Sequence, residues 1–271
     1  MAREADRQRA AVARAYAHAL DAPAPPARGH GLARYDWRDV ALLPEAVRTA
    51  SLGCANPFAY AAVEPGQTVL DLGCGAGLDL VLAARRVGEG GRVLGVDMTP
   101  DLLARARTHT AGHPAVGVCR ALMESLPVRD GVADWVLSNG ALSLSPEKAR
   151  VLEEVVRVLR PGGRVLLCDV VAAGLPVALR RAAQARGSCL AGALDLPALV
   201  QALRAAGLRE VAVAGHVRYG PEERAALAEA ELEDAAADWG EAEVGSAAVS
   251  AVKDVGGGSI DPVPPAEERW P

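Results

Sequence analysis

Apolar and polar positions along the middle of the chain follow a repeated strand-and-helix pattern. The short apolar run Thr68–Leu72 leads straight into glycines at positions 73, 75 and 77, and a helix-like apolar spacing follows over Leu78–Val87. A second short apolar run then ends at Asp97. In α/β proteins a strand, a glycine turn and a helix together expose bare backbone to a ligand. The pattern therefore predicts a Rossmann-like, doubly wound α/β sheet with a ligand site just after its first strand.

Later segments extend the same pattern. We expect residues 132–139 to form a fourth strand, and Arg160-Pro-Gly-Gly163 to turn into a fifth strand over 164–171. The apolar spacing of 193–206 predicts an amphipathic helix, and 210–217 a late strand. The core of the sheet is thus predicted to end near residue 171, with further elements added behind it.

The two ends of the chain have a different character. Residues 1–20 suit a helix, 222–238 one acidic helix, and the Gly/Pro-rich residues 256–271 disorder. We therefore expect an N-terminal helix and substrate-site lid (1–57), a cofactor-binding core (58–171), a substrate-recognition insert with the last strands (172–220) and a partly disordered tail (221–271).

Composition narrows the class of protein. Apolar residues make up 51% of the chain but aromatic residues only 3%, so the core must be built from Ala, Val and Leu. The net charge is −5 and no basic face studded with aromatic residues is visible, which argues against a nucleic-acid partner. No apolar stretch approaches a membrane span, and the first residues lack an apolar signal core. We expect a cytoplasmic monomer with a small-molecule substrate.

The spacing of the glycines indicates which class of ligand the turn binds. A dinucleotide fingerprint would place its third glycine at position 78, where this chain has Leu78. Glycines at alternate positions after an acidic strand end, Asp71, resemble motif I of the class I S-adenosylmethionine-dependent methyltransferases. We expect Asp97 to accept the ribose hydroxyls and Met98 to give the adenine a soft apolar wall. The expected cofactor contacts are Asp71, Gly73, Cys74, Gly75, Gly77, Asp97, Met98, Met123, Glu124 and Asn139.

The five cysteines form no CxxC pair, which argues against a zinc ribbon or a redox motif. Cys119 and Cys168 lie in apolar strand patterns and are expected to be inert buried thiols, and Cys74 is expected to pack inside the glycine loop. Cys54 and Cys189 differ, because each lies in a glycine-flanked segment outside the predicted sheet. From the pattern alone these two are equally well explained as unremarkable small residues.

Several segments together resemble those of the arsenite methyltransferase family. They are 52–57 (LGCANP), 71–79 (DLGCGAGLD), 95–100 (GVDMTP), 138–139 with 144–148, and 189–193. The similarity runs from about residue 12 to about residue 217. In that family, cysteines at the positions of Cys54 and Cys189 hold trivalent arsenic as thiolates, which are soft ligands suited to a thiophilic metalloid. The resemblance implies S-adenosylmethionine as methyl donor, an arsenic substrate, and a thiol reductant such as glutathione or thioredoxin.

The chain departs from this family in its cysteines. The usual Ser-Asn-Cys of the fourth strand is Ser138-Asn139-Gly140. Members that methylate arsenite also commonly bring a third cysteine from the carboxy-terminal part, whereas no cysteine follows Cys189 here. Arsenite has three exchangeable ligands and methylarsenite has two. Two thiols therefore predict methylarsenite as the substrate, unless an external thiol completes the set for arsenite.

Two other functions stay open at this point. The chain could be a methyltransferase for an organic small molecule, with Cys54 and Cys189 incidental. It could also be a non-catalytic homologue that binds a metalloid or a cofactor. Consumption of thiols by arsenic separates the first alternative from arsenic methylation, and methyl turnover separates both enzymes from the second.

Overall fold

A seven-stranded sheet organises the chain, whose computed structural model describes residues 2–17, 34–41, 43–232, 234 and 237–255. The strand order is β3-β2-β1-β4-β5-β7-β6. The strands are β1 (Thr68–Leu72), β2 (Arg92–Asp97), β3 (Val116–Arg120), β4 (Ala133–Asn139), β5 (Leu159–Ala173), β6 (Leu208–Arg218) and β7 (Glu243–Lys253). Strands β1 to β5 pair with one another in parallel, and β7 pairs antiparallel with both β5 and β6. The doubly wound sheet expected from the sequence is confirmed.

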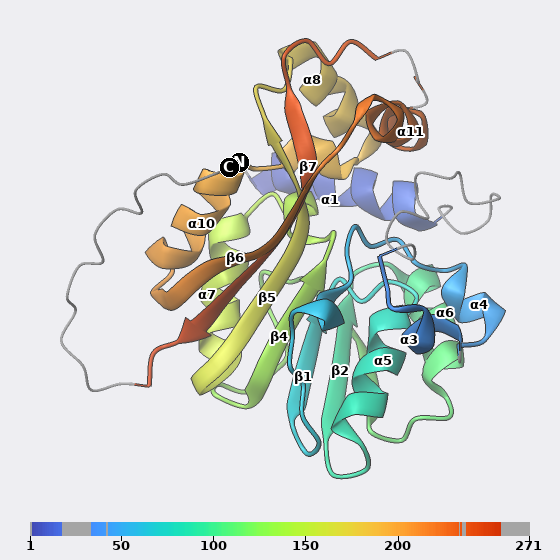
Figure 1. Cartoon of the computed structure of the whole chain (residues 1–271), viewed down its shortest axis with the longest axis vertical. Helices are drawn as coiled ribbons and strands as arrows, with labels where there is room; N and C mark the ends of the chain where they lie inside the picture. Colours follow the sequence, from blue (N-terminus) through green and yellow to red (C-terminus); the bar gives the residue numbers. More distant parts are fainter. Residues whose placement is uncertain (1, 18–33, 42, 233, 235–236, 256–271) are drawn as a thin grey trace.

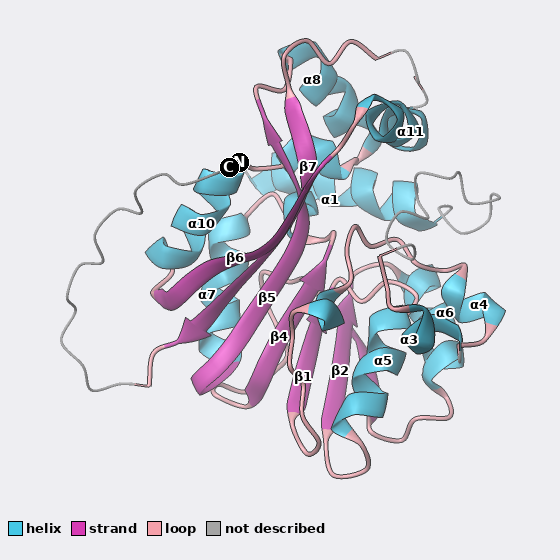
Figure 2. Cartoon of the chain, in the orientation of Figure 1, coloured by secondary structure: helices cyan, strands magenta, loops and turns pink. Residues whose placement is uncertain are grey.

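Helices precede the first strand and fill most of the connections between the strands (Figure 2). They are α1 (Ala2–Ala17), α3 (Trp37–Ala41), α4 (Glu45–Arg48), α5 (Leu78–Val87), α6 (Pro100–Thr110), α7 (Lys148–Val158), α8 (Val177–Arg186), α9 (Cys189–Gly192), α10 (Leu196–Ala205) and α11 (Pro221–Leu232). Two 3₁₀ turns are η1 (Pro57–Ala59) and η2 (Leu142–Leu144). The predicted helices Leu78–Val87 and 193–206 are confirmed as α5 and α10.

Helices cover both faces of the sheet (Figure 1). On one face α5 packs against β1 and β2, and α6 against β2 and β3. On the other face α7 packs against β5, and α10 against β5, β6 and β7. The largest fully buried side chains in the described part of the chain are all leucines. The expectation of an aliphatic core is therefore confirmed.

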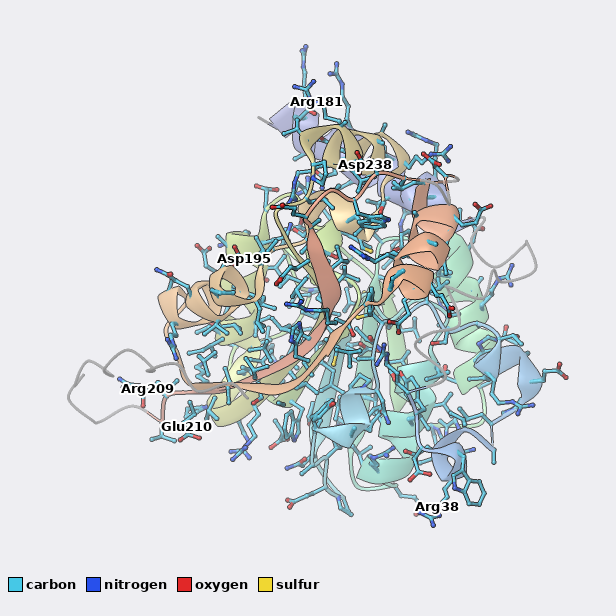
Figure 3. All side chains as sticks on the ribbon, turned by 45° about the horizontal axis from the view of Figure 1, so that its top comes forward. Arg38, Arg181, Asp195, Arg209, Glu210 and Asp238 are labelled. Atoms are coloured by element: carbon cyan, nitrogen blue, oxygen red, sulfur yellow. The ribbon has the colours of Figure 1, made fainter. Side chains whose placement is uncertain are left out.

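A third group of helices lies beyond the carboxyl ends of the parallel strands, at the top of Figure 1. There α8 contacts α1, α9 and α11, and α9 contacts η2. Figure 3 shows Arg181 of α8 at this end of the molecule, and Arg209 and Glu210 of β6 at the opposite end. Because ligands of open α/β sheets bind outside the carboxyl ends of the strands, this layer covers the place where a ligand site is expected.

Local sequence signals explain where several of these elements begin and end. Asp195 caps α10 by accepting a hydrogen bond from the Ala198 amide over 2.7 Å, as an N-cap acid does. Pro100 opens α6, where its missing amide hydrogen removes no helical bond. Gly187 ends α8 with φ of 70°, a left-handed value that favours glycine. In β2, a Cβ on Gly95 would lie 2.6 Å from Leu80 Cδ1, so glycine lets α5 approach the sheet.

The strand β7 is the main element that the sequence analysis missed. Residues 243–253 were assigned to the tail, but they lie between β5 and β6 and pair with both. The predicted acidic helix 222–238 is also shorter, because α11 ends at Leu232. The fifth strand begins earlier than expected, since the Pro-Gly-Gly segment is already part of β5. The predicted disorder of 256–271 lies outside the described residues, and the proposed division into domains stays a prediction.

Among the helices that the structure describes, none has the length and apolar character that crossing a membrane requires.

Candidate active site

Three glycines shape the turn between β1 and α5. Gly73, Gly75 and Gly77 have φ of 71°, 52° and 91°, values that residues with a Cβ rarely adopt. The amides of Gly73 and Cys74 donate hydrogen bonds to the Val96 carbonyl of β2 over 2.8 and 3.1 Å, which fixes the turn to the neighbouring strand. A Cβ on Gly75 would meet no atom within 4 Å. The turn therefore presents bare backbone to open space.

That open space is a pocket at the carboxyl ends of β1, β2 and β4. Its walls include the glycine turn, the segment 50–53 and one side of α1. The residues predicted to contact a cofactor all line it: Asp71, Gly73, Cys74, Gly75, Gly77, Asp97, Met98, Met123, Glu124 and Asn139. The sequence thus predicted residues that share one cavity, and it predicted an N-terminal helix and substrate-site lid without naming the residues of α1 that line the pocket.

Three carboxylates of the pocket are buried, which disfavours their ionised forms. Burial raises the pKa of Asp71, Asp79 and Asp97, and brings that of Asp79 to about 6. The charges of Asp79 and Asp97 raise the pKa of Asp71 further. Among the described residues, Asp71 Oδ2 is buried without a hydrogen-bond partner. A cation bound among these groups would favour their charged forms, and S-adenosylmethionine, with a sulfonium and an ammonium against one carboxylate, fits this need.

Asp97 is held at the wall of the pocket by several hydrogen bonds. Its Oδ2 accepts a hydrogen bond from the Gly75 amide over 3.0 Å, and its Oδ1 accepts one from the Thr99 amide over 2.8 Å. The Thr99 side chain and the Met98 backbone also hydrogen-bond to this carboxylate, and Asp97 lines the pocket. The two backbone contacts also hold the carboxylate at the glycine turn, where a nucleoside would follow the methionyl part.

The helix α1 closes one side of the pocket through Arg9. Its Nη2 lies 3.1 Å from Glu124 Oε1 and also contacts the Glu147 carboxylate. Glu124 accepts a further hydrogen bond from the Ser145 hydroxyl over 2.8 Å. Val12 of the same helix lines the pocket as well. Glu124 was predicted to contact the cofactor, and the structure shows that its carboxylate also binds a helix about 115 residues away in sequence.

Asn139, at the end of β4, binds the segment that carries Cys54. Its Oδ1 accepts hydrogen bonds from the Cys54 and Ala55 amides over 3.0 and 3.2 Å. Its Nδ2 donates to the Ala55 carbonyl over 2.9 Å and to Asp79 Oδ2 over 3.1 Å. Tyr35 donates its hydroxyl to the other Asp79 oxygen over 2.5 Å. The end of β4, the start of α5 and the Cys54 segment are thereby held together.

Cys54 and Cys189 are both buried, with 8% and 6% of their surface exposed. Burial raises the pKa of Tyr219, the ionised forms of Cys54 and Cys189 would raise it further, and a hydrogen bond with the Ser246 side chain lowers it. Cys189 opens the short helix α9, which Ser188 caps by accepting from the Leu190 amide. The two cysteines, far apart in the sequence, therefore belong to one apolar cluster that also contains Tyr219.

The environment of the thiols differs from the expectation. We expected Cys54 and Cys189 to lie in loops outside the core, but both belong to the apolar cluster that also contains Cys74 and Cys168. Burial, followed by the charges of Asp169 and Cys168, raises the pKa of Cys54 well above its ordinary value. The helices α8 and α9 cover this end of the sheet, which the sequence pattern could not reveal.

The other cysteines are mostly as predicted. Cys168 has no exposed surface and Cys74 only 7%, so the expectation of buried thiols is confirmed for both. The prediction is wrong for Cys119, which is only half-buried, because β3 is an edge strand of the sheet. Within the described part of the chain, three or more His, Cys, Asp or Glu side chains do not converge as a metal site.

Four residues of the site were not singled out from the sequence. Arg9, Tyr35 and Tyr219 carry no local signal, because each reaches the site only through tertiary packing. Asp79 was visible in the glycine motif, and its place two residues after Gly77 puts it in the first turn of α5. An acidic residue in the first turn of α5, close to Asp71, was the sequence signal that could have identified Asp79 as part of the site.

Comparison with known proteins identifies the family of this chain. Residues 63–225 match the family model described as a methyltransferase domain. The chain is 45% identical over 183 residues to an arsenite methyltransferase of Halobacterium salinarum, covering 66% of this chain and 46% of the relative. It is 35% identical to the arsenite methyltransferase of Mus musculus, covering 49% and 39%. The chain thus spans less than half the length of these two curated relatives.

A solved structure extends the comparison further. The arsenic(III) S-adenosylmethionine methyltransferase of Chlamydomonas reinhardtii matches with a TM-score of 0.67 and 33% identity, over 86% of this chain and 75% of that one. The fold alone is shared with phosphoethanolamine N-methyltransferase 2 of Haemonchus contortus in complex with S-adenosyl-L-methionine, at 17% identity and a TM-score of 0.57, over 72% and 50% of the two chains. The chain therefore belongs to the class I methyltransferases and, within them, to the arsenite methyltransferase family.

Proposed function

We propose that this protein transfers a methyl group from S-adenosylmethionine to trivalent arsenic held by Cys54 and Cys189. The observation that carries the proposal is the position of the Cys54 segment. Ser51, Leu52 and Gly53 line the cofactor pocket, and the next residue, Cys54, belongs to the same buried apolar cluster as Cys189 and Tyr219. A methyl donor and a pair of soft ligands would therefore lie on adjacent sides of one short segment.

The cofactor end of the site is built from backbone and carboxylates. S-adenosylmethionine, when bound, supplies an electrophilic methyl group on a sulfonium. In our proposal the glycine turn accommodates its methionyl part, Asp97 holds the ribose, and Asp71, with an oxygen that has no partner among the described residues, offsets its positive charge. In our proposal the helix α1 and the segment 50–53, which line this pocket, act as a lid that keeps water from it.

The arsenic end is built from thiols in an apolar cluster. Trivalent arsenic is thiophilic and suits sulfur ligands. Burial raises the pKa of Cys54, so it enters the reaction as a thiol. Each As–S bond then forms as an arsenic hydroxyl takes the thiol proton and leaves as water. The bound arsenic keeps its lone pair, which is the nucleophile for the methyl group, and the protein holds the two centres in attack geometry, an effect worth up to roughly 7–11 kcal/mol.

The number of thiols favours methylarsenite as the substrate. Methylarsenite has two exchangeable ligands and can bind Cys54 and Cys189 without a further donor. Arsenite has three, and the family's cysteine in the fourth strand is Gly140 here. We propose that arsenite reacts only with an external thiol such as glutathione as its third ligand, and that a thiol reductant supports further turnovers.

The proposal is tested by product identification. The full-length protein is incubated with labelled S-adenosylmethionine, glutathione and either arsenite or methylarsenite, and the methylated arsenicals are separated and counted. We expect labelled dimethylated arsenic from methylarsenite, its loss in Cys54→Ser and Cys189→Ser, and its retention in the matched variant Cys119→Ser. Label in an organic acceptor, with none in arsenic, would instead support the organic-substrate alternative. An absence of any turnover together with cofactor binding would support the non-catalytic one.

A further inference from the structure

We infer that Asn139 is a positioning residue for the Cys54 thiol and does not bind the cofactor. The inference rests on the proposed function, in which Cys54 is an arsenic ligand. Asn139 lines the cofactor pocket, so its location alone would suit either role. The hydrogen bonds of its side chain decide between them.

The amide of Asn139 is fully occupied by protein groups. An amide oxygen can accept two hydrogen bonds and an amide nitrogen can donate two. Oδ1 accepts from the Cys54 and Ala55 amides, and Nδ2 donates to the Ala55 carbonyl and to Asp79. These partners fix which end of the side chain is oxygen and which is nitrogen. The backbone amides of Cys54 and Ala55 need an acceptor, and the Ala55 carbonyl and the Asp79 carboxylate need a donor. Nothing is left for the hydroxyls or amine of a nucleoside.

These contacts act directly on the thiol. The Cys54 Sγ atom lies 3.8 Å from Asn139 Oδ1, in addition to the 3.0 Å bond from the Cys54 amide to the same oxygen. The Asn139 oxygen therefore fixes the Cys54 backbone, and the thiol lies in a weaker contact with the same oxygen. Because the arsenic must bridge Cys54 and Cys189, a shift of this segment would change the sulfur–sulfur separation and with it the approach to the methyl group.

Asn139 is itself positioned by contacts with Tyr35 and Asp79. Tyr35, which is buried, contacts Nδ2 at 3.2 Å and donates its hydroxyl to Asp79. Asp79 in turn accepts from Nδ2 and lines the cofactor pocket. The Cys54 segment is thus tied to the start of α5 and the glycine turn. The structure connects the thiol to the wall of the cofactor pocket through one amide side chain.

Gly53 shows how tightly this amide fits. A Cβ on Gly53 would lie 2.3 Å from Asn139 Nδ2 and 2.5 Å from its Cγ, distances that force the amide to move. Gly53→Ala therefore displaces Asn139 without removing it and should have the same effect as Asn139→Ala. A matched control is Asn56→Ala, since Asn56 lies in the same segment and accepts one hydrogen bond, from the Phe58 amide over 3.0 Å.

The test measures the thiol and the cofactor separately. The full-length protein and the variants Asn139→Ala, Gly53→Ala and Asn56→Ala are treated with phenylarsine oxide, and peptide mass spectrometry follows the bridge between Cys54 and Cys189. The alkylation rate of Cys54 relative to Cys189 and the Kd for S-adenosylmethionine are measured on the same samples. Steady-state methylation of methylarsenite gives kcat and KM for each substrate.

We expect Asn139→Ala and Gly53→Ala to slow bridge formation and lower kcat by about tenfold, which corresponds to losing roughly one or two net hydrogen bonds. The Kd and KM for the cofactor should stay within about twofold, and Asn56→Ala should bridge like the unmodified protein. A tenfold loss of cofactor affinity in Asn139→Ala would overturn the inference and make Asn139 a cofactor ligand. An equal loss of bridge formation and kcat in Asn56→Ala would also overturn the inference, because the effect would then come from packing of the whole loop.

The design also separates this inference from the proposed function. If the unmodified protein methylates no arsenical, the proposed function fails. The inference still stands in that case if Asn139→Ala and Gly53→Ala change the alkylation of Cys54 relative to Cys189 and Asn56→Ala does not. If methylarsenite is turned over and Asn139→Ala leaves both bridging and kcat unchanged, the proposed function stands and the inference is wrong.

Discussion

Arg9 of α1 and Glu124, in the loop after β3, form an ion pair beside the cofactor pocket, with Nη2 and Oε1 3.1 Å apart. Both side chains are largely buried, with 17% and 8% of their surface exposed, so the pair is better shielded from water than a surface salt bridge. This contact, together with that of Arg9 to Glu147, holds the helix against the pocket wall. We therefore expect α1 to slow the release of a bound cofactor.

The first prediction follows from this contact. Arg9→Ala should increase the dissociation rate of S-adenosylmethionine about tenfold, because it removes the link that closes α1 and leaves a buried carboxylate without its cation. Stopped-flow displacement of the cofactor measures the rate. Arg7→Ala is the matched control, since Arg7 lies on the same helix, is 79% exposed and is 3.9 Å from Glu4. Equal rates in the Arg9 and Arg7 variants would show that α1 does not gate the pocket.

The second prediction concerns pH. Burial raises the pKa of Asp79 to about 6, so this carboxylate is protonated in much of the free protein below pH 6. A net cationic cofactor favours the ionised form, and its affinity should therefore increase as pH rises through about 6. The linkage predicts an affinity about tenfold lower at pH 5 than at pH 7.

Stability of the free protein should respond in the opposite direction. Because the pKa of Asp79 is higher in the folded state than in the unfolded state, its contribution is fully present below the unfolded pKa and is lost as pH rises through about 6. Isothermal titration with S-adenosylmethionine from pH 5 to pH 7, on the protein and on Asp79→Asn, checks the binding. Asp101→Asn, an exposed acid in α6, is the control. The same pH slope in Asp79→Asn as in the unmodified protein would assign the titration to another group.

The third prediction tests the unexpected strand. Val249 has no exposed surface, and β7 pairs with β5 and β6 on either side of it. Val249→Asp buries a carboxylate without a partner and should lower the free energy of unfolding by about 4 kcal/mol or more. Val255→Asp, at a side chain that is 71% exposed, should leave it nearly unchanged. Urea denaturation measures both, and a tolerant Val249→Asp would mean that β7 is dispensable for the sheet.

The sequence predicted the first half of the sheet well because its signals are local. The run Thr68–Leu72, the three glycines and the helix Leu78–Val87 lie next to one another, and each agrees with the next. The strand Glu243–Lys253 has no such support. It contains five small Ala and Ser residues among its eleven, so its alternation of apolar and polar positions is weak, and its burial is decided by β5 and β6, which are distant in sequence.

The same reasoning explains the outcome at the candidate site. The residues of the pocket could be predicted because the ends of parallel strands meet at one edge of the sheet. The role of Asn139 could not, because it depends on the segment around Cys54 folding back onto the end of β4. The burial of Cys189 depends likewise on α8 and α9 packing over the sheet, and no local pattern near this residue encodes that contact.

The last prediction is that adding a third thiol to the site allows arsenite to react without an external thiol. Gly140 stands where the family has the cysteine of Ser-Asn-Cys, and a Cβ there would lie 3.8 Å from the Cys54 amide nitrogen with no closer contact than 3.7 Å. Gly140→Cys would therefore place a third thiol beside Cys54 without a clash. Its φ of 78° is unfavourable for a side chain, and we expect a loss of stability of roughly 1–2 kcal/mol. The first turnover of arsenite should then proceed without glutathione, whereas the unmodified protein should need it.

Single-turnover assays with labelled S-adenosylmethionine, with and without glutathione, measure this difference. Gly140→Ser is the matched control, because it carries the same backbone strain and a side chain of similar size but no soft ligand. Methylarsenite, which needs only two thiols, should react equally fast in both variants and so report that the site is intact. Arsenite turnover that depends on glutathione to the same extent in Gly140→Cys and Gly140→Ser would show that the missing thiol is not what limits the first methylation.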